Sequence, residues 1–581
     1  MKVAGYITRY WKELLTLMFG VTVWLFWNNL YWGHLMYQEQ LQLFLFDMDY
    51  LWERVAIPGG FVDYVSEFLT QFFYVTSAGA FVIALLMMLM QRLIWAIAKH
   101  KEVSDTCYIF SFAPVFLLWA VQSDENLLLS YSVALLFLLL AIRLSQLLDD
   151  KWPLQALLIP VLYFLAGPVH FMLALWLVLQ LWRKHKWTIL AFPLLACLCP
   201  YLSSFVYHYH IQQLLSGVNF YRIPDEFPLV LVAVESAFVL VPWLLTVIPE
   251  KINLTVSSRP VILFFCLFFL AGFWLVYVTM DEEREDLLQY NELMYEKKWK
   301  RIISKAEQKS PENAISVSAL NMALCMNGQL TNRMFEFHQY GLGGLFPLSD
   351  KDYIISFFTS EVYYHLGMIN ESQRFAFEAM EGIKNHRKSA RSYKRLAETN
   401  IINGDFDVAA KYLRALKKTL YYRGWADRAM RCLHNDEMTG RHPEWGWMRE
   451  VRFKEDFIAS PDIIPAMLVE LTRVNGKNLL ALEYLIAYML LEHNFEALAA
   501  YVPLLQSAGY AHLPRSYQEA LAYYWQEQGK EYTDIPWPVD KSVFHEMEDF
   551  VRVYNTASNP KEALASRYGK SYWYYLLRIS E

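Results

Sequence analysis

The sequence predicts an all-α protein in two parts: a polytopic bundle of membrane helices over residues 1–280, then a soluble α-solenoid of tetratricopeptide-like repeats over residues 281–581. Two observations predict this fold. Charged residues number 32 in the first 280 positions and 78 in the remaining 301, a contrast typical of a bilayer-embedded part followed by a water-soluble one. The second part shows helical periodicity throughout and no alternating strand pattern.

Composition excludes several classes of protein. The net charge is −6 and the pI is about 6.2, with no basic cluster outside the loops, so we expect no nucleic-acid partner. Four of the six cysteines lie in apolar runs, which favours small buried side chains over a disulfide framework. The sequence contains no phosphate-binding glycine loop, no Ser-His-Asp constellation and no HExxH run.

The first apolar run, residues 14–32, follows Lys2, Arg9 and Lys12. It is too long for a signal-peptide core and lacks a small-x-small cleavage site, so it predicts an uncleaved anchor with a cytoplasmic N-terminus. Eight further apolar runs follow at 71–95, 106–122, 127–147, 153–167, 168–182, 188–207, 228–248 and 260–280. The last run has 21 uncharged residues; at ~1.5 Å per residue it spans ~31 Å, about one hydrocarbon core.

Charge in the connecting loops predicts the orientation of these runs. Basic residues follow the second, sixth and eighth runs: Arg92, Lys99, Lys101, Arg183, Lys184, Lys186, Lys251 and Arg259. By the positive-inside rule these loops are cytoplasmic. The acid-biased loops 34–68, 122–126 and 210–227 are then expected to face outward.

The orientation of everything after residue 153 depends on Gly167-Pro168. If residues 153–182 formed one helix, every later loop would be inverted. Because Gly-Pro breaks helices, we interpret this stretch as two short spans, which keeps all basic loops inside. Nine crossings then place residues 281–581 outside. The expected location is the bacterial inner membrane, with the C-terminal domain in the periplasm.

Self-similar segments recur in the second part, at 321–340, 360–380, 397–418 and 487–505. Each has an apolar helical pattern, a turn residue and an amphipathic helical pattern. The turn glycines Gly328, Gly367 and Gly404 are 39 and 37 residues apart, close to the ~34-residue tetratricopeptide repeat. Such helix pairs stack into a solenoid whose concave face holds a peptide or a partner protein.

Several blocks carry a family resemblance over essentially the whole chain: EVYYHLGMINESQRFAFEAM, RSYKRLAETNIINGDFDVAAKYLRALKKTLYYRGWA, PRSYQEALAYY and EQLQLFLFDMDYLWERVAIPGGFVDYVSEFLTQFF. They resemble a family of uncharacterised bacterial multi-pass membrane proteins with a tetratricopeptide-like tail. The resemblance implies an inner-membrane location and assigns no activity.

The architecture is also similar to that of polytopic glycosyltransferases that use polyprenyl-phosphate sugar donors. The shared features are a cytoplasmic N-terminus, a long acidic first outer loop, many spans and an outward soluble tail. The sequence departs from that pattern because no paired Asp-Asp or Asp-Glu follows the first span. Fold analogy alone does not establish activity.

The first outer loop, residues 34–70, contains the strongest candidate catalytic residues. Leu41, Leu45 and Met48 are spaced to share one face of an amphipathic helix on the membrane surface. The candidate catalytic carboxylates around it are Glu39, Asp49 and Asp63. In a transferase such a carboxylate could act as general base on an acceptor hydroxyl or hold a divalent metal beside a phosphate. The alternative is a solvated outer-loop helix.

Four further residues are candidates for substrate binding. Glu235 lies inside an apolar run, where an ionisable group is costly unless it is paired or faces a cavity. His208 and Arg222 fall in one predicted outer loop, and His170 lies beside the Gly-Pro break. The alternatives are a protonated bundle residue for Glu235, an interfacial cluster for His208 and Arg222, and a packed ring for His170. His208 and His210 are spaced to bind a metal on an extended segment, but without a third ligand beside them no metal site is predicted.

Three functional hypotheses follow. The leading one is a membrane protein in the lipid bilayer whose outward repeat domain binds or arranges a protein or peptide partner. The alternative is an outer-leaflet transferase of a polyprenyl-phosphate sugar; a divalent metal is expected only in that case, and no other cofactor is predicted. The third is a transporter, suggested by Glu235 and the broken 153–182 stretch.

Overall fold

The computed structural model describes residues 2–100, 103–148, 151–182, 188–223, 227–247, 259–347, 352–383, 387–454, 463–510 and 512–579. Every element in these ranges is helical, and the described residues contain no strand beyond an isolated bridge between Leu127 and Arg222. The predicted all-α class is confirmed.

The chain forms two compact units. Unit 1 comprises Met1–Glu285 together with two short segments from far along the chain, Ile383–Ala390 and Lys417–Arg423. Unit 2 comprises Asp286–Gly382, Arg391–Leu416 and Gly424–Glu581. No pattern in the sequence indicated that the two short segments pack with the apolar first part.

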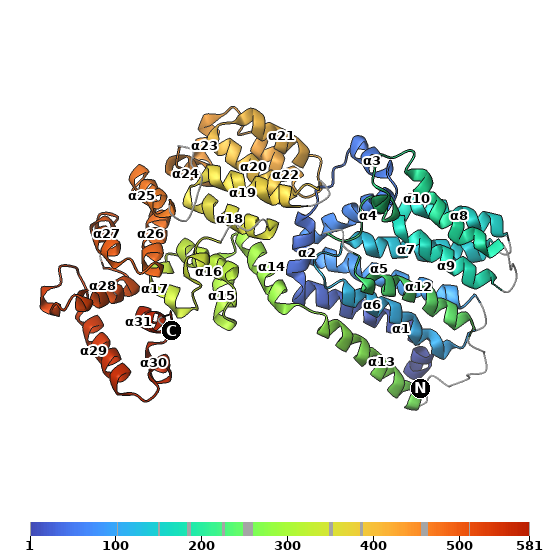
Figure 1. Cartoon of the computed structure of the whole chain (residues 1–581), viewed down its shortest axis with the longest axis horizontal. Coiled ribbons are helices and arrows are strands. Elements are labelled where there is room, and N and C mark those ends of the chain that lie inside the picture. The colour runs from blue at the N-terminus through green and yellow to red at the C-terminus, as the bar shows by residue number, and fades with distance from the viewer. Residues whose placement is uncertain are drawn as a thin grey trace. The chain divides into compact units, whose positions relative to one another are not determined.

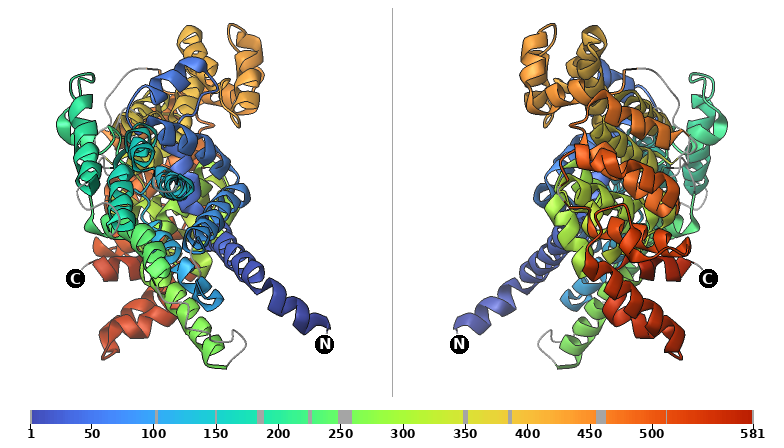
Figure 2. Two further views of the ribbon diagram at one scale, coloured as in Figure 1. Left: turned by 90° about the vertical axis from the view of Figure 1, so that its right-hand side faces the viewer. Right: turned by 90° about the vertical axis from the view of Figure 1, so that its left-hand side faces the viewer.

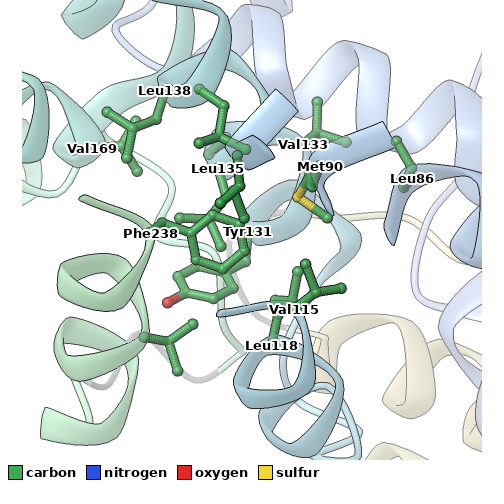
Figure 3. Packing of buried hydrophobic residues seen from close by; sticks show 14 of the residues in the cluster. Leu86, Met90, Val115, Leu118, Tyr131, Val133, Leu135, Leu138, Val169 and Phe238 are labelled. Carbon is green, nitrogen blue, oxygen red and sulfur yellow. The ribbon is translucent and has the colours of Figure 1, made fainter. Parts of the chain in front are cut away.

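Figure 1 draws the helices of unit 1 in blue to green and labels all of them except α11. They are α1 (Lys2–Leu25), α2 (Trp32–Gln40), α3 (Met48–Val55), α4 (Gly60–Thr70), α5 (Thr76–Ala98), α6 (Ala113–Val121), α7 (Leu129–Leu147), α8 (Trp152–Ala166), α9 (His170–Leu181), α10 (Ala191–Ser203), α11 (Ile211–Leu215), α12 (Leu229–Val247) and α13 (Arg259–Val278). Buried aliphatic and aromatic side chains from α5, α6, α7 and α12 meet in its core (Figure 3).

Five described helices are long and apolar enough to cross a membrane: Thr76–Ala98, Leu129–Leu147, Trp152–Leu181, Leu229–Val247 and Arg259–Val278. The number becomes six if Tyr10–Leu30 and Trp32–Gln40, which are bent by 76° to each other, count as one span. The apolar helices over Asp105–Val121 and Ala191–Ser203 are shorter. Nine crossings therefore remain a prediction.

The apolar stretch of α8 and α9 is broken at Gly167, whose φ is +69°. At the start of α8, Gln155 Nε2 donates to the backbone oxygen of Ser145 in α7 at 2.9 Å. At the end of α9, Trp182 lines the same cavity as Gln146 of α7. Both ends of the stretch thus lie at one end of the helix bundle, and the chain turns back at the break.

The amphipathic helix predicted from the spacing of Leu41, Leu45 and Met48 is wrong. α2 ends at Gln40, the next six residues after a turn at Leu41 are not helical, and α3 begins only at Met48. Asp47 has extended dihedrals and caps α3 through its side chain. A capped helix start and extended backbone interrupt the helical pattern that the apolar spacing alone suggested.

Unit 2 contains α14 (Glu282–Tyr295), which begins in unit 1, and then α15 (Trp299–Gln308), α16 (Ala314–Met326), α17 (Leu330–Arg333), α18 (Tyr353–Leu366), α19 (Ile369–Gly382), α20 (Ala390–Asn403), α21 (Phe406–Leu416), α22 (Arg423–Met430), α23 (Asp436–Arg441), α24 (Pro443–Val451), α25 (Ile464–Val474), α26 (Leu479–Leu491), α27 (Phe495–Ser507), α28 (Arg515–Glu527), α29 (Lys541–Thr556), α30 (Pro560–Tyr568) and α31 (Tyr572–Ile579). Gly367 and Gly404 separate α18 from α19 and α20 from α21, with φ values of +94° and +92°. These left-handed turns end the first helix of each pair.

Candidate functional site

The loops that the charge pattern groups together lie at one end of unit 1. Gln38 Nε2 in α2 donates to the backbone oxygen of Leu127 at 2.6 Å. Asn219 Nδ2, from the segment before α12, donates to Asp63 Oδ2 in α4 at 3.2 Å. Arg222 Nε of the third loop lies 2.8 Å from Asp124 Oδ2 of the second. Residues of the first, second and third predicted outer loops therefore lie close together. We call this the outer-loop end of unit 1.

The two short segments from far along the chain pair with acidic side chains of the first outer loop. Tyr422 OH donates to Glu39 Oε2 at 3.1 Å, and both groups are buried. Lys418 forms an ion pair with Asp47 through its Nζ. The carboxylates of this loop thus receive their partners from residues some 370 positions away in the sequence.

A third pairing builds the charged centre of this end. Arg387 Nη1 lies 3.6 Å from Glu67 Oε1, and its Nη2 lies 3.9 Å from Asp63 Oδ1. The Arg387 side chain is only 7% exposed, and both carboxylates are buried as well. One guanidinium therefore faces two carboxylates in a site with little water.

Glu67 also bonds to α3. Arg54 Nε lies 3.1 Å from Glu67 Oε2, and Tyr50 OH donates to the same oxygen. Burial, reinforced by the Glu67 charge, raises the pKa of Tyr50 well above its usual value, so Tyr50 stays protonated and able to donate. Tyr50, Arg54, Asp63, Glu67 and Arg387 form what we call the outer-loop cluster.

Asp63 is the member of the cluster that changes its protonation state near neutral pH. Burial raises its pKa to about 6, the Glu67 charge adds to this, and Arg387 and Arg54 oppose it. The bond from Asn219 also favours the charged form but does not restore the usual value.

Replacing Asp63 with asparagine tests this electrostatic account. Between pH 7 and pH 5 the folded wild type takes up a proton that the unfolded chain does not, so its free energy of unfolding rises as pH falls, by about 1 kcal/mol from this group. We expect Asp63→Asn to remove that rise. The free energy of unfolding at pH 7 and at pH 5 measures it, with the exposed Glu53→Gln as control. An unchanged pH dependence in Asp63→Asn contradicts the account.

A cavity of about 200 Å³ opens beside the cluster. Its charged lining residues are Asp47, Asp49, Glu53, Arg54, Glu67, Arg387 and Lys388. Carboxylates and cations thus share one small polar space. Chemically, such a lining can hold an anionic group through the cations and accept a proton at an exposed carboxylate.

The predicted catalytic residues occupy three different positions at this end. Asp49 lines the cavity and is exposed. Glu39 is buried against Tyr422, and Asp63 is buried in the cluster, so neither lines the 200 Å³ space. In the described residues no three His, Cys, Asp or Glu side chains come together as metal ligands.

The predicted binding residues do not line this cavity. His170 is fully buried, with its ring nitrogens 2.9 Å and 3.0 Å from the backbone oxygens of Gly167 and Ala196. Arg222 Nε pairs with Asp124 Oδ2 at 2.8 Å. His208 is exposed, and Glu235 is buried within α12.

Sequence reasoning missed Arg387, Lys418 and Tyr422. The one sequence feature that could have drawn attention to this set is that Arg387 and Lys388 are adjacent basic residues in a connection between two helical patterns. Nothing in that connection indicates a carboxylate partner in the first outer loop.

These features define the class of protein: an all-helical chain with five to six apolar helices long enough to cross a membrane and a second helical unit. The family model described as Family of unknown function (DUF6057) matches residues 7–579. The chain belongs to this family, in agreement with the resemblance to an uncharacterised family. No curated protein and no solved structure matches the chain.

Proposed function

We propose that the protein is an integral membrane protein, and the observation that carries this is the surface of α13. After Arg259 this helix is apolar on every side, yet only 11% of its most apolar part is buried. Figure 2 shows α13 in green as one unbroken helix. An apolar surface of this size is untenable in water and suits lipid.

The charge distribution supports an orientation. The outer-loop end carries the acidic residues described above, whereas Lys12 and Lys99 both pair with Asp105 at the opposite end of α5. In the sequence, further basic residues follow α9 and α12. By the positive-inside rule the outer-loop end faces away from the cytoplasm, and α13 returns the chain to that side. Unit 2 is then extracytoplasmic, in a bacterium periplasmic.

The function that we propose for unit 2 is binding of a partner polypeptide by a tetratricopeptide-like repeat. A cavity of about 440 Å³ between α28, α29 and α31 supports this. Its lining includes Tyr523, Phe550, Tyr554, Trp573 and Leu577. Aromatic and aliphatic walls with a polar rim are typical of sites that receive a peptide side chain.

Site-specific cross-linking tests partner binding. A photoreactive amino acid in place of the exposed Tyr554 is expected to capture one discrete polypeptide in intact cells. The same substitution at Tyr340, an exposed tyrosine of unit 2 outside this cavity, is the matched control and is expected to capture none. Identical products from both positions contradict the assignment of the site.

A second function, transfer of a sugar from a polyprenyl phosphate at the outer leaflet, is favoured by the 200 Å³ cavity. Arg54, Arg387 and Lys388 offer cations for a phosphate, and Asp49 is an exposed carboxylate on the same lining. A divalent metal is expected only in this mechanism.

The transferase hypothesis predicts that Asp49→Asn lowers turnover at least ~100-fold, the usual contribution of a general base. Sugar release from a polyprenyl-phosphate donor by the purified full chain measures this. The control is Glu437→Gln, which removes an exposed carboxylate of unit 2. Full turnover in Glu39→Gln, Asp49→Asn and Asp63→Asn would exclude the hypothesis.

The transporter hypothesis depends on the broken 153–182 stretch and on Glu235. Its carboxyl is buried in α12, one turn after Leu231, whose backbone oxygen accepts a 2.7 Å bond from Tyr131 OH in α7. Substrate uptake that is abolished in Glu235→Gln and intact in Asp49→Asn would favour transport over transfer.

A further inference from the structure

α5 presents an exposed apolar stripe along its length. Phe81, Leu85 and Leu89 are large exposed side chains four residues apart, so they share one face of the helix. This helix is also one of those long and apolar enough to cross a membrane. In the proposed membrane location the stripe faces lipid, and the start of α5 at Thr76 marks the outer boundary of the hydrocarbon core.

Aromatic side chains lie around the start of α5. The rings of Phe46, Phe68 and Phe72 contact one another in a row, with centroids 6.3 Å and 5.7 Å apart. Tyr74, two residues before the helix, is exposed and stacks on Tyr421 with ring centroids 4.8 Å apart. We call these five residues the aromatic belt. Such belts are typical of the level at which membrane proteins meet lipid headgroups.

Tyr421 belongs to Lys417–Arg423, which packs with unit 1 although it lies far along the chain. We call this stretch the basic segment. Its backbone is joined to the first outer loop, because Phe46 N donates to the backbone oxygen of Lys418 at 2.8 Å. In its middle, Leu420 is a large exposed apolar side chain. The basic segment therefore lies at the level of the start of α5 and adds an apolar side chain to the surface there.

The two segments that pack with unit 1 from far along the chain carry an excess of positive charge. In the sequence, Ile383–Ala390 and the basic segment together have six Lys or Arg residues and no Asp or Glu, although the net charge of the chain is −6. Arg387 and Lys418 face carboxylates of the first outer loop. The excess exceeds what these pairs account for.

The two other cations of the basic segment are on the surface. Lys417 and Arg423 are exposed at its two ends, and the exposed Leu420 lies between them. Tyr421 joins the segment to the aromatic belt. Cations that flank apolar and aromatic side chains match a phospholipid with an anionic headgroup, because phosphates meet the cations while acyl chains meet the apolar side chains.

We propose that the basic segment and the aromatic belt bind anionic phospholipid in the outer leaflet. Leu420 and the stacked tyrosine pair enter the acyl region, and Lys417 and Arg423 bind headgroup phosphates. A lipid surface is the occupant because this patch continues the lipid-facing stripe of α5 and its excess charge is opposite to that of the headgroups. The inference rests on the proposed membrane location, and it gives lipid a role in holding the basic segment at the outer-loop end.

Photo-cross-linking in intact cells tests the occupant. A photoreactive amino acid in place of Leu420 is expected to give a phospholipid adduct of the full chain, recognised by its loss on treatment with phospholipase. A polypeptide adduct in its place, or no adduct, would overturn the lipid assignment. The same substitution at Leu479, an exposed leucine of unit 2, is the matched control and is expected to give no lipid adduct. Equal lipid labelling at both positions overturns the proposal.

The same substitution at Leu85 separates this inference from the membrane location on which it rests. Leu85 lies on the stripe of α5 and is expected to give a lipid adduct. A lipid adduct at Leu85 without one at Leu420 refutes this inference alone. Absence of a lipid adduct at both positions refutes the membrane location itself.

Native mass spectrometry of the detergent-purified full chain tests the charge of the headgroup. Phosphatidylglycerol, which is anionic, is compared with phosphatidylcholine, which has the same phosphate but no net charge. We expect Arg423→Gln to retain phosphatidylglycerol about fivefold more weakly than the wild type, the usual contribution of one cation at an anionic surface, and phosphatidylcholine equally well. The matched control is Arg473→Gln, which removes a highly exposed arginine of unit 2 and is expected to change neither.

Two results of this comparison contradict the proposal. Equal retention of the two lipids by the wild type would show that the headgroup charge is not recognised. A loss in Arg473→Gln equal to that in Arg423→Gln would show that the basic segment is not the site. Glycerol phosphate is expected not to displace phosphatidylglycerol; displacement at millimolar concentration would show a site for a soluble anion and overturn the lipid assignment.

Discussion

Replacing Glu361 with glutamine is expected to lower the free energy of unfolding of unit 2 by about 3 kcal/mol. Glu361 is 2% exposed in α18. Arg395 Nη2 lies 2.6 Å from its Oε2, and Arg391 Nη2 lies 3.4 Å from its Oε1. Removing the carboxylate charge leaves two buried guanidinium groups without their shared counterion, which is the costly way to break a buried pair.

The pKa of Glu361 gives a stabilisation free energy of the same size. Burial alone would raise its pKa, but Arg395, Arg391 and His365 outweigh burial and hold the pKa at about 2. The fall from the usual 4.5 corresponds to about 3 kcal/mol at ~1.36 kcal/mol per pKa unit. Because the folded-state pKa is depressed, this stability is present above pH 4.5 and is lost as pH falls towards 2.

Unfolding of the full chain in urea measures the effect. The protease resistance of the unit 2 fragment reports how much of unit 2 is folded at each urea concentration. Glu437→Gln is the matched control because Glu437 pairs with Arg441 at a highly exposed site, where such pairs contribute little. A midpoint for Glu361→Gln equal to that of the control would show that the buried network does not stabilise unit 2.

The second large effect is expected from Gly217→Ala. Gly217 has a φ of +80°, and a Cβ there would lie 2.8 Å from the Cα of Gly167 and 3.2 Å from Pro168 Cδ. The left-handed backbone costs a non-glycine residue about 1–2 kcal/mol, and the contact with backbone forces the α8–α9 break to move. We expect a loss of more than ~3 kcal/mol, at the upper end of single substitutions.

Gly404→Ala separates the cost of the left-handed backbone from the cost of the steric contact. Gly404 has a similar φ of +92°, but nothing lies within 4 Å of its added Cβ. This variant is expected to show only the backbone cost. Thermal unfolding in detergent compares the two, and equal losses would show that the close approach of Gly217 to Gly167 does not hold the break in place.

Local sequence patterns predicted the helices because burial in a helix bundle and exposure to lipid both require runs of apolar residues at helical spacing. The structure has helices within each of the nine predicted apolar runs. The same reasoning failed between Leu41 and Met48, where apolar spacing resembled a helix but the chain is not helical before the α3 cap. Apolar periodicity does not show whether a capping carboxylate or a helical turn occupies a position.

Only the acidic half of the candidate site was predictable from the sequence. Glu39 and Asp63 were singled out because acidic residues gather in the first outer loop, and both lie at the outer-loop end. Their partners Tyr422 and Arg387 come from segments that nothing in the local sequence connects to that loop. A pairing across more than 300 residues depends on tertiary packing, which one sequence does not reveal.

The central claim is that α13 crosses a membrane and carries the following residues to its outer side. An alkaline phosphatase fused after Glu581 tests it directly, because this enzyme is active only where its disulfides form. The account predicts an active phosphatase in whole cells, matching a fusion within residues 122–126 and opposite to one after Lys99. An inactive phosphatase on a full-length fusion present at normal level would place unit 2 in the cytoplasm and contradict the account.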